Sequence, residues 1–178
     1  MGLLEEIYPA LWEAMGYERG KGPGSVLDLA CGLHPLGRQW MGLGEECRYV
    51  AADIDKRMVE LVGEVFACFG WKGEAVWGDI LEEDWSVWGA EVVMMMKTLP
   101  CVEQQEEGAG LELLKRLLGG TGQWVVVSYP SKSLGGREKG MYETYRRQVG
   151  EWEKVLGRQA REIGFENETF YIFRGSGC

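Results

Sequence analysis

Short apolar runs alternate with stretches of helical hydrophobic spacing along most of the chain. A run of this length, bounded by glycine, proline or charged residues, is typical of a buried strand. The pattern predicts seven strands, at Ser25–Ala30, Arg48–Asp55, Glu74–Ile80, Ala90–Pro100 and Gln123–Pro130, around Phe165, and at Thr169–Phe173.

The segments between these runs place apolar residues three or four positions apart, which predicts amphipathic helices. The clearest stripes are Met58, Leu61, Val62, Val65, Phe66 and Phe69 in one segment and Leu111, Leu114, Leu117 and Leu118 in another. Before the first strand, the stretch from Leu4 to Met15 has the same spacing, although Pro9 could start or break a helix there. A polar helix is expected over residues 138–159.

Alternation of strands and helices predicts an α/β fold with a mostly parallel, doubly wound, seven-stranded sheet and helices on both faces. Residues 1–24 are then an N-terminal helix or lid segment, and residues 25–178 form one domain. A chain of 178 residues suits a single domain and buries enough surface to fold without a disulfide or a structural metal.

Charge and cysteine content narrow the function classes. The chain has 19 basic and 28 acidic residues, a net charge of −9, which excludes a broadly basic nucleic-acid-binding surface. Residues 1–130 carry a net charge of −11 and residues 131–178 carry +2, so phosphate contacts are expected in the C-terminal third.

Five cysteines without a C-x-x-C pair and a single histidine argue against a metal site and indicate reduced thiols. No apolar run approaches the ~20 residues of a membrane span, so a cytoplasmic protein without membrane contact is expected.

The carboxyl ends of the central strands are where a doubly wound sheet binds its ligand. The first strand leads into the segment DLACG at residues 28–32, in which Gly32 allows the backbone to turn tightly and approach a ligand. His34 and Pro35 stand where a nicotinamide fingerprint needs glycines, which argues for a cofactor without phosphates. His34 itself is interpreted as structural.

Two further acids follow the next two strands. Asp53 is in the place of an acid that accepts hydrogen bonds from ribose hydroxyls. Asp79 can accept a bond from an adenine amino group while Ile54 and Ile80 flank the ring. Each acid alone could equally cap a helix or occupy a turn. The neighbouring Asp55 is expected to cap the helix that follows it. In this order, however, the acids that follow the strands indicate an adenosine pocket for S-adenosylmethionine.

Three longer segments extend this interpretation: DLACGLHPLG, KTLPCVEQQEEGAGLELLKRL and VSYPSKSLGGREKGM. Together they resemble the aminoglycoside-resistance methyltransferases, which modify N7 of a guanine in the decoding site of 16S ribosomal RNA. The resemblance runs from Val26 to Phe173. It implies a class I, Rossmann-like methyltransferase domain, S-adenosylmethionine as donor, guanine N7 as acceptor, and 16S rRNA in the 30S subunit as partner.

The resemblance also implies roles for individual residues in cofactor binding. Ala30 and Gly32 would line the methionine end of the cofactor, Asp53 would hold the ribose, and Asp79 would meet the adenine between Ile54 and Ile80. Asp28 is also predicted to bind the cofactor. Lys97 and Leu99, in the K-x-L-P segment, would lie beside the reactive methyl group.

For the RNA, the resemblance implies a basic loop. Lys132, Arg137 and Lys139 would grip phosphates, and Met141 would help to hold the target nucleotide. No catalytic base is expected, because guanine N7 presents a lone pair and carries no proton.

The sequence departs from the family at three points. His34 replaces the usual asparagine, Gly78 stands where an amide is common, and 24 residues precede the first strand where members carry a helical domain that docks on the small ribosomal subunit. Three hypotheses therefore stay open. The protein is a guanine-N7 methyltransferase of 16S rRNA, a methyltransferase of another RNA or a small molecule, or a cofactor-binding homologue that needs a partner protein for substrate docking.

Overall fold

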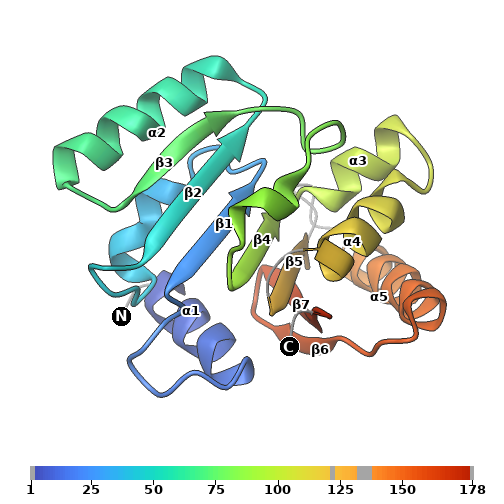
Figure 1. Ribbon diagram of the computed structural model, residues 1–178. Coiled ribbons are helices and arrows are strands. Elements are labelled where there is room, and N and C mark those ends of the chain that lie inside the picture. The colour runs from blue at the N-terminus through green and yellow to red at the C-terminus, as the bar shows by residue number, and fades with distance from the viewer. Residues whose placement is uncertain (1–2, 121–122, 132–137, 177–178) are drawn as a thin grey trace.

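A twisted seven-stranded sheet forms the centre of the molecule, in the order β3-β2-β1-β4-β5-β7-β6 (Figure 1). The computed structural model describes residues 3–120, 123–131 and 138–176. The strands are β1 (Ser25–Leu29), β2 (Arg48–Asp53), β3 (Gly73–Trp77), β4 (Val92–Met96), β5 (Trp124–Pro130), β6 (Arg161–Gly164) and β7 (Glu168–Arg174).

Strands β1 to β5 pair in parallel, and β7 runs antiparallel to both β5 and β6. The predicted mostly parallel, seven-stranded sheet is therefore confirmed. From β1 the chain builds outward through β2 to β3, and then crosses to β4 on the other side of β1. The strand order thus reverses between β1 and β4, which is where an open α/β sheet forms its binding crevice.

Four predicted strands extend too far: the second ends at Asp53 and the third at Trp77, before the predicted Asp55 and Ile80. Strand β1 ends at Leu29 and β4 ends at Met96, because the next residues, Ala30 and Lys97, have left-handed φ angles of 52° and 57°. The prediction that the fourth strand reaches Pro100 is wrong, since that residue lies in the first turn of a helix. Left-handed non-glycine residues are uncommon and tend to cluster at functional sites.

Helices cover both faces of the sheet, as predicted (Figure 1). One face carries α1, the 3-10 helix η1 and α2, and the other carries the 3-10 helix η2, α3, α4 and α5. Their bounds are α1 Leu3–Ala14, η1 His34–Trp40, α2 Lys56–Phe69, η2 Trp85–Trp88, α3 Leu99–Gln105, α4 Ala109–Gly120 and α5 Glu138–Leu156.

The two faces hold two separate apolar clusters, because successive strand residues point to opposite sides of a sheet. In β4, Val93 and Met95 pack toward α4, whereas Val92 and Met94 pack toward α1. All four are completely buried. The central strands are therefore covered on both sides, as their continuous apolar runs predict.

Helix α1 belongs to one of these layers. It runs from Leu3 through Pro9 to Ala14, so the proline neither starts nor breaks it. Tyr8, Leu11 and Trp12 are buried, and the Trp12 indole donates to the carbonyl oxygen of Met41 at 2.6 Å. The segment predicted as a helix or lid is thus a helix packed beside η1.

Helix α2 buries a narrower stripe than its sequence predicts. Val62 and Phe66 are buried, but Leu61 and Phe69 are 40% and 62% exposed. The helix lies over β2 and the edge strand β3, so only part of its apolar surface meets the sheet. Asp55 caps the helix by accepting a bond from the Arg57 backbone N–H at 2.9 Å, as predicted.

Candidate cofactor site at the carboxyl ends of the strands

The turn after β1 is bonded directly to the end of β2. Gly32 donates its backbone N–H to Oδ2 of Asp53 at 2.8 Å, and Asp55 donates to Oδ1 of the same carboxylate at 2.9 Å. A carboxylate has about four lone-pair positions, so Asp53 retains acceptor capacity for two further donors. Ala30 and Gly32 both adopt left-handed φ angles in this turn, which presents the backbone toward the crevice.

A cavity of about 150 Å³ opens beside this turn. Ala30, Ile54, Asp79 and Ile80, four of the residues predicted to bind the cofactor, line it together. Oδ1 of Asp79 accepts the backbone N–H of Leu81 at 2.9 Å, which fixes the carboxylate at the cavity wall. Whole-ligand pockets measure about 300–1,000 Å³, so this cavity suits one flat ring system rather than an entire nucleoside derivative.

Helix α3 supplies the opposite wall, which the sequence analysis missed. Thr98, Cys101, Val102 and Gln105 line the cavity from this side. They come from the segment that directly follows the left-handed residue Lys97. No motif marks them, because their contribution depends on where that bend aims the helix.

Asp28 lies below the surface of the site. Its side chain is completely buried, and Oδ2 accepts bonds from the Tyr49 hydroxyl at 2.8 Å and from Nδ1 of His34 at 2.7 Å. Oδ1 has no hydrogen-bond partner within the described residues. Direct contact between Asp28 and a cofactor stays a prediction.

Lys97 lies at the carboxyl end of β4, and Leu99 lies behind it. The Lys97 backbone N–H donates to the Ser128 hydroxyl at 3.0 Å, and its ammonium pairs with Glu168 at 2.8 Å. Ser128 also donates to Glu168 at 2.5 Å, so this unit joins β4, β5 and β7. Leu99 is completely buried in the core, which leaves its predicted contact with the cofactor as a prediction.

Two of the four predicted RNA-binding residues lie outside the described residues. Lys132 and Arg137 lie there, while Lys139 and Met141 lie in the first turn of α5. Met141 is half-buried. This turn follows the segment that leaves β5 at the carboxyl edge of the sheet.

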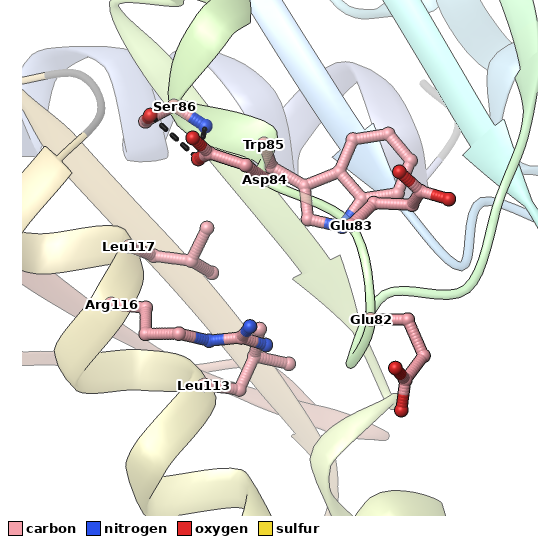
Figure 2. A pocket seen from close by; sticks show the side chains of 8 residues that line it. All are labelled: Glu82, Glu83, Asp84, Trp85, Ser86, Leu113, Arg116 and Leu117. Atoms are coloured by element: carbon pink, nitrogen blue, oxygen red, sulfur yellow. Dashed lines mark hydrogen bonds between the residues drawn. The ribbon is translucent and has the colours of Figure 1, made fainter.

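A second cavity, of about 220 Å³, lies between the segment after β3 and helix α4 (Figure 2). Trp85, Leu113 and Leu117 form its apolar part, with acidic residues and Arg116 around them. Asp84 caps η2 there, because its carboxylate accepts a hydrogen bond from the Ser86 backbone N–H at 3.0 Å. None of the residues predicted to bind the cofactor lines this cavity.

Across residues 3–120, 123–131 and 138–176, no group of three or more His, Cys, Asp or Glu side chains is placed to hold a metal ion. The four cysteines in these ranges are unpaired thiols. In the same ranges, no helix combines the length and the apolar character needed to cross a bilayer.

His34 holds a proton more strongly than an ordinary histidine. Burial lowers the pKa of the imidazole, but the Asp28 carboxylate, the hydrogen bond to it and the charge of Glu168 together outweigh burial and the nearby Lys97 ammonium. The pKa of His34 is therefore raised above its usual range. The folded state binds this proton more tightly than the unfolded chain does.

The raised pKa of His34 predicts a pH-dependent stability. Its contribution is complete below the unfolded pKa of about 6.5 and is lost as the pH rises through the higher folded value. Tyr8 and Tyr49, which also face the ring, have pKa values raised by burial and by Asp28, so they stay neutral in this window. We expect the urea midpoint of unfolding to fall as the pH rises above the unfolded value. His34→Asn should flatten this slope, and an unchanged slope in the variant would contradict the assignment.

The doubly wound sheet with an antiparallel β7, and a cavity beside the turn after β1, make this the fold of class I S-adenosylmethionine-dependent methyltransferases. The chain belongs to the ribosomal RNA methyltransferase (FmrO) family, which it matches over residues 1–171.

Named relatives agree with this family. A 16S rRNA (guanine(1405)-N(7))-methyltransferase from Micromonospora rosea is 36% identical over 150 residues, which are 84% of this chain and 53% of that protein. The structure of the 16S rRNA methylase ArmA matches with a TM-score of 0.75 and 26% identity, over 97% of this chain and 82% of that one. The chain spans about half the length of the curated relatives it matches.

A second solved relative carries a bound ligand. The 16S rRNA methyltransferase RmtF, in complex with S-adenosyl-L-homocysteine, matches with a TM-score of 0.68 and 31% identity. The match covers 85% of this chain and 55% of that chain.

Proposed function

We propose that this protein transfers a methyl group from S-adenosylmethionine to N7 of a guanine in the decoding site of 16S rRNA. The observation that carries the proposal is the arrangement at the carboxyl ends of β1, β2 and β3. There Ala30 and Asp79 line the cavity, and the Asp53 carboxylate holds the backbone N–H of Gly32 in the turn beside it. The named relatives support the same reaction.

The residues present fit an adenosine-containing cofactor. Asp53 would accept hydrogen bonds from the two ribose hydroxyls at the lone-pair positions that its bonds from Gly32 and Asp55 leave open. Asp79 would accept from the adenine amino group, and Ile54 and Ile80 would flank the ring in the 150 Å³ cavity. The bound cofactor would supply an activated methyl group on a sulfonium centre.

The chain's own contribution to the reaction would be placement. Guanine N7 offers an in-plane lone pair and no proton, so no general base is needed. His34, the one histidine of the chain, is already bonded to Asp28 and Tyr8 and is not free to act as one. Holding donor and acceptor in line converts a bimolecular step into an effectively unimolecular one, which is worth about 7–11 kcal/mol in favourable cases.

The acceptor would approach from the C-terminal third of the chain. Residues 131–178 carry a net charge of +2 against −11 for residues 1–130, so phosphates would be held locally. Lys132, Arg137 and Lys139 would contact the backbone, and Met141 would support a guanine that has left its stack, at a cost of a few kcal/mol.

Arg137→Glu is expected to weaken association with 16S rRNA and to reduce its salt dependence by about one phosphate contact. The affinity for S-adenosylhomocysteine should not change, because the predicted cofactor contacts lie at or after the ends of β1, β2, β3 and β4. Filter binding at several salt concentrations, beside a calorimetric titration, measures both. Loss of both affinities would mean that the loop is structural.

The reaction itself is tested by incubating the protein with S-adenosylmethionine and either isolated 30S subunits or naked 16S rRNA. Mass spectrometry of the RNA should show one additional methyl group at N7 of a decoding-site guanine. RNA that remains unmodified in both cases would refute the proposed substrate. Methylation of another RNA or of a small molecule would favour the second hypothesis.

A partner protein is a second candidate, favoured by the net charge of −9 on a protein whose substrate would be a polyanion. In that case the chain would bind the cofactor alone, and methyl transfer would appear only after the partner is added. Turnover by the purified chain on 30S subunits would exclude this requirement.

A further inference from the structure

A chain of buried polar side chains connects helix α1 to the turn after β1. The Tyr8 hydroxyl is hydrogen-bonded to Nε2 of His34, and Nδ1 of His34 donates to Asp28 at 2.7 Å. Tyr49 on β2 donates to the same oxygen of Asp28 at 2.8 Å. Four side chains from α1, β1, the start of η1 and β2 are thus joined in one network.

Burial makes each bond in this network costly to lose. Tyr8 is 3% exposed, Asp28 and Tyr49 are completely buried, and the His34 side chain is 18% exposed. When the partner of such a buried polar group is removed, the full desolvation penalty of that group is incurred, because water cannot reach it to replace the lost hydrogen bond. Local low dielectric also strengthens the bonds that are made.

The network holds one side of the turn whose other side is held by Asp53. His34 lies two residues after Gly32, whose N–H donates to Asp53 at 2.8 Å, and Cys31 donates to the carbonyl oxygen of Ala52 at 3.0 Å. The turn is therefore fixed toward β2 by Gly32 and Cys31, and toward α1 and β1 by His34. Ala30, the non-glycine residue with a left-handed φ in this turn, requires such outside support.

We infer that His34 is a positioning residue for the cofactor site and that Tyr8 makes helix α1 part of that site. His34 holds the turn in the conformation that presents Ala30 and Gly32 to the cofactor, and Tyr8 acts on the turn only through His34. The inference rests on the proposed cofactor site and concerns how that site is kept in shape. It predicts that Tyr8 on α1 affects the affinity for the cofactor without touching it.

A double-mutant cycle on cofactor affinity tests this prediction. Calorimetric titration with S-adenosylhomocysteine is carried out on the full chain, Tyr8→Phe, His34→Ala and the double variant. Each single change should weaken binding about tenfold, the usual effect of one buried hydrogen bond. The double variant should bind no more weakly than His34→Ala alone, because Tyr8 has nothing left to act through.

Two further variants separate positioning from general stability. His34→Asn can keep a donor toward Asp28 but loses the bond to Tyr8, so it should bind better than His34→Ala and be insensitive to Tyr8→Phe. Tyr17→Phe is the matched control, since the Tyr17 hydroxyl donates to Glu91 at 3.0 Å and the ring packs edge-on against Trp12. It should lower the melting temperature and leave the affinity unchanged.

The outcomes distinguish this inference from the proposed function. If the unmodified chain does not bind S-adenosylhomocysteine, the cofactor site is refuted, and this inference with it. If the unmodified chain binds but Tyr8→Phe binds equally well, or if the two effects add, the positioning role is refuted and the cofactor site stands. If His34→Ala does not fold, the cycle is completed with His34→Asn.

Discussion

Asp53→Ala is expected to weaken the binding of S-adenosylhomocysteine by about a hundredfold or more, the cost of losing hydrogen bonds to a charged group. The carboxylate would contact both ribose hydroxyls, and it also holds Gly32 at 2.8 Å and Asp55 at 2.9 Å. The variant would therefore lose ligand contacts and the anchor of the turn together. Isothermal titration calorimetry measures the affinity directly.

Asp84→Ala is a suitable control for this experiment. Asp84 also accepts a backbone N–H two residues ahead, from Ser86 at 3.0 Å, but it caps η2 and does not line the candidate cavity. It should lower the stability slightly, through the lost cap, and leave the affinity intact. An unaltered titration curve for Asp53→Ala would remove the assignment of the pocket.

Gly73→Ala is expected to lower the free energy of unfolding by about 2–4 kcal/mol. Gly73 has a φ of 151°, and a Cβ there would lie 1.9 Å from the carbonyl oxygen of Tyr49, its partner in β2. A backbone atom cannot move aside as a flexible side chain can, so β3 would have to separate from β2. Because Asp79 follows β3, cofactor affinity should fall as well. Urea denaturation and calorimetry measure the two effects.

Gly63→Ala provides the matched comparison. Gly63 lies within α2, and the nearest atom to its added Cβ is the Cβ of Ala75 at 3.8 Å, an ordinary contact. This change should stabilise the helix by about 0.5–1 kcal/mol. Equal effects of the two substitutions would show that the close approach at Gly73 is relaxed in solution.

The fold was largely predictable because its information lies in local patterns. Apolar runs identify the strands, helical spacing identifies α2 and α4, and alternation of the two implies the parallel sheet. Element ends were less predictable. The left-handed conformations of Ala30 and Lys97 end two strands early, and no sequence rule assigns that conformation to alanine or lysine.

The site was predictable where it depends on strand ends and not where it depends on packing. Ala30, Ile54, Asp79 and Ile80 follow strands, so their convergence on one cavity follows from the topology. The wall from α3 and the pair of Ser128 with Glu168 depend on how distant segments meet. The buried network at His34 likewise needs Tyr8, 26 residues away in the chain.

The division of the interior by the sheet has a consequence for engineering. A void created beneath α4 cannot be refilled by side chains beneath α1, since the hydrogen-bonded backbone of the sheet stands between them. The effects of substitutions on opposite sides of the sheet on the free energy of unfolding should then be additive. Stability could thus be tuned in small increments from either side, while the turns that carry the chemistry are left untouched.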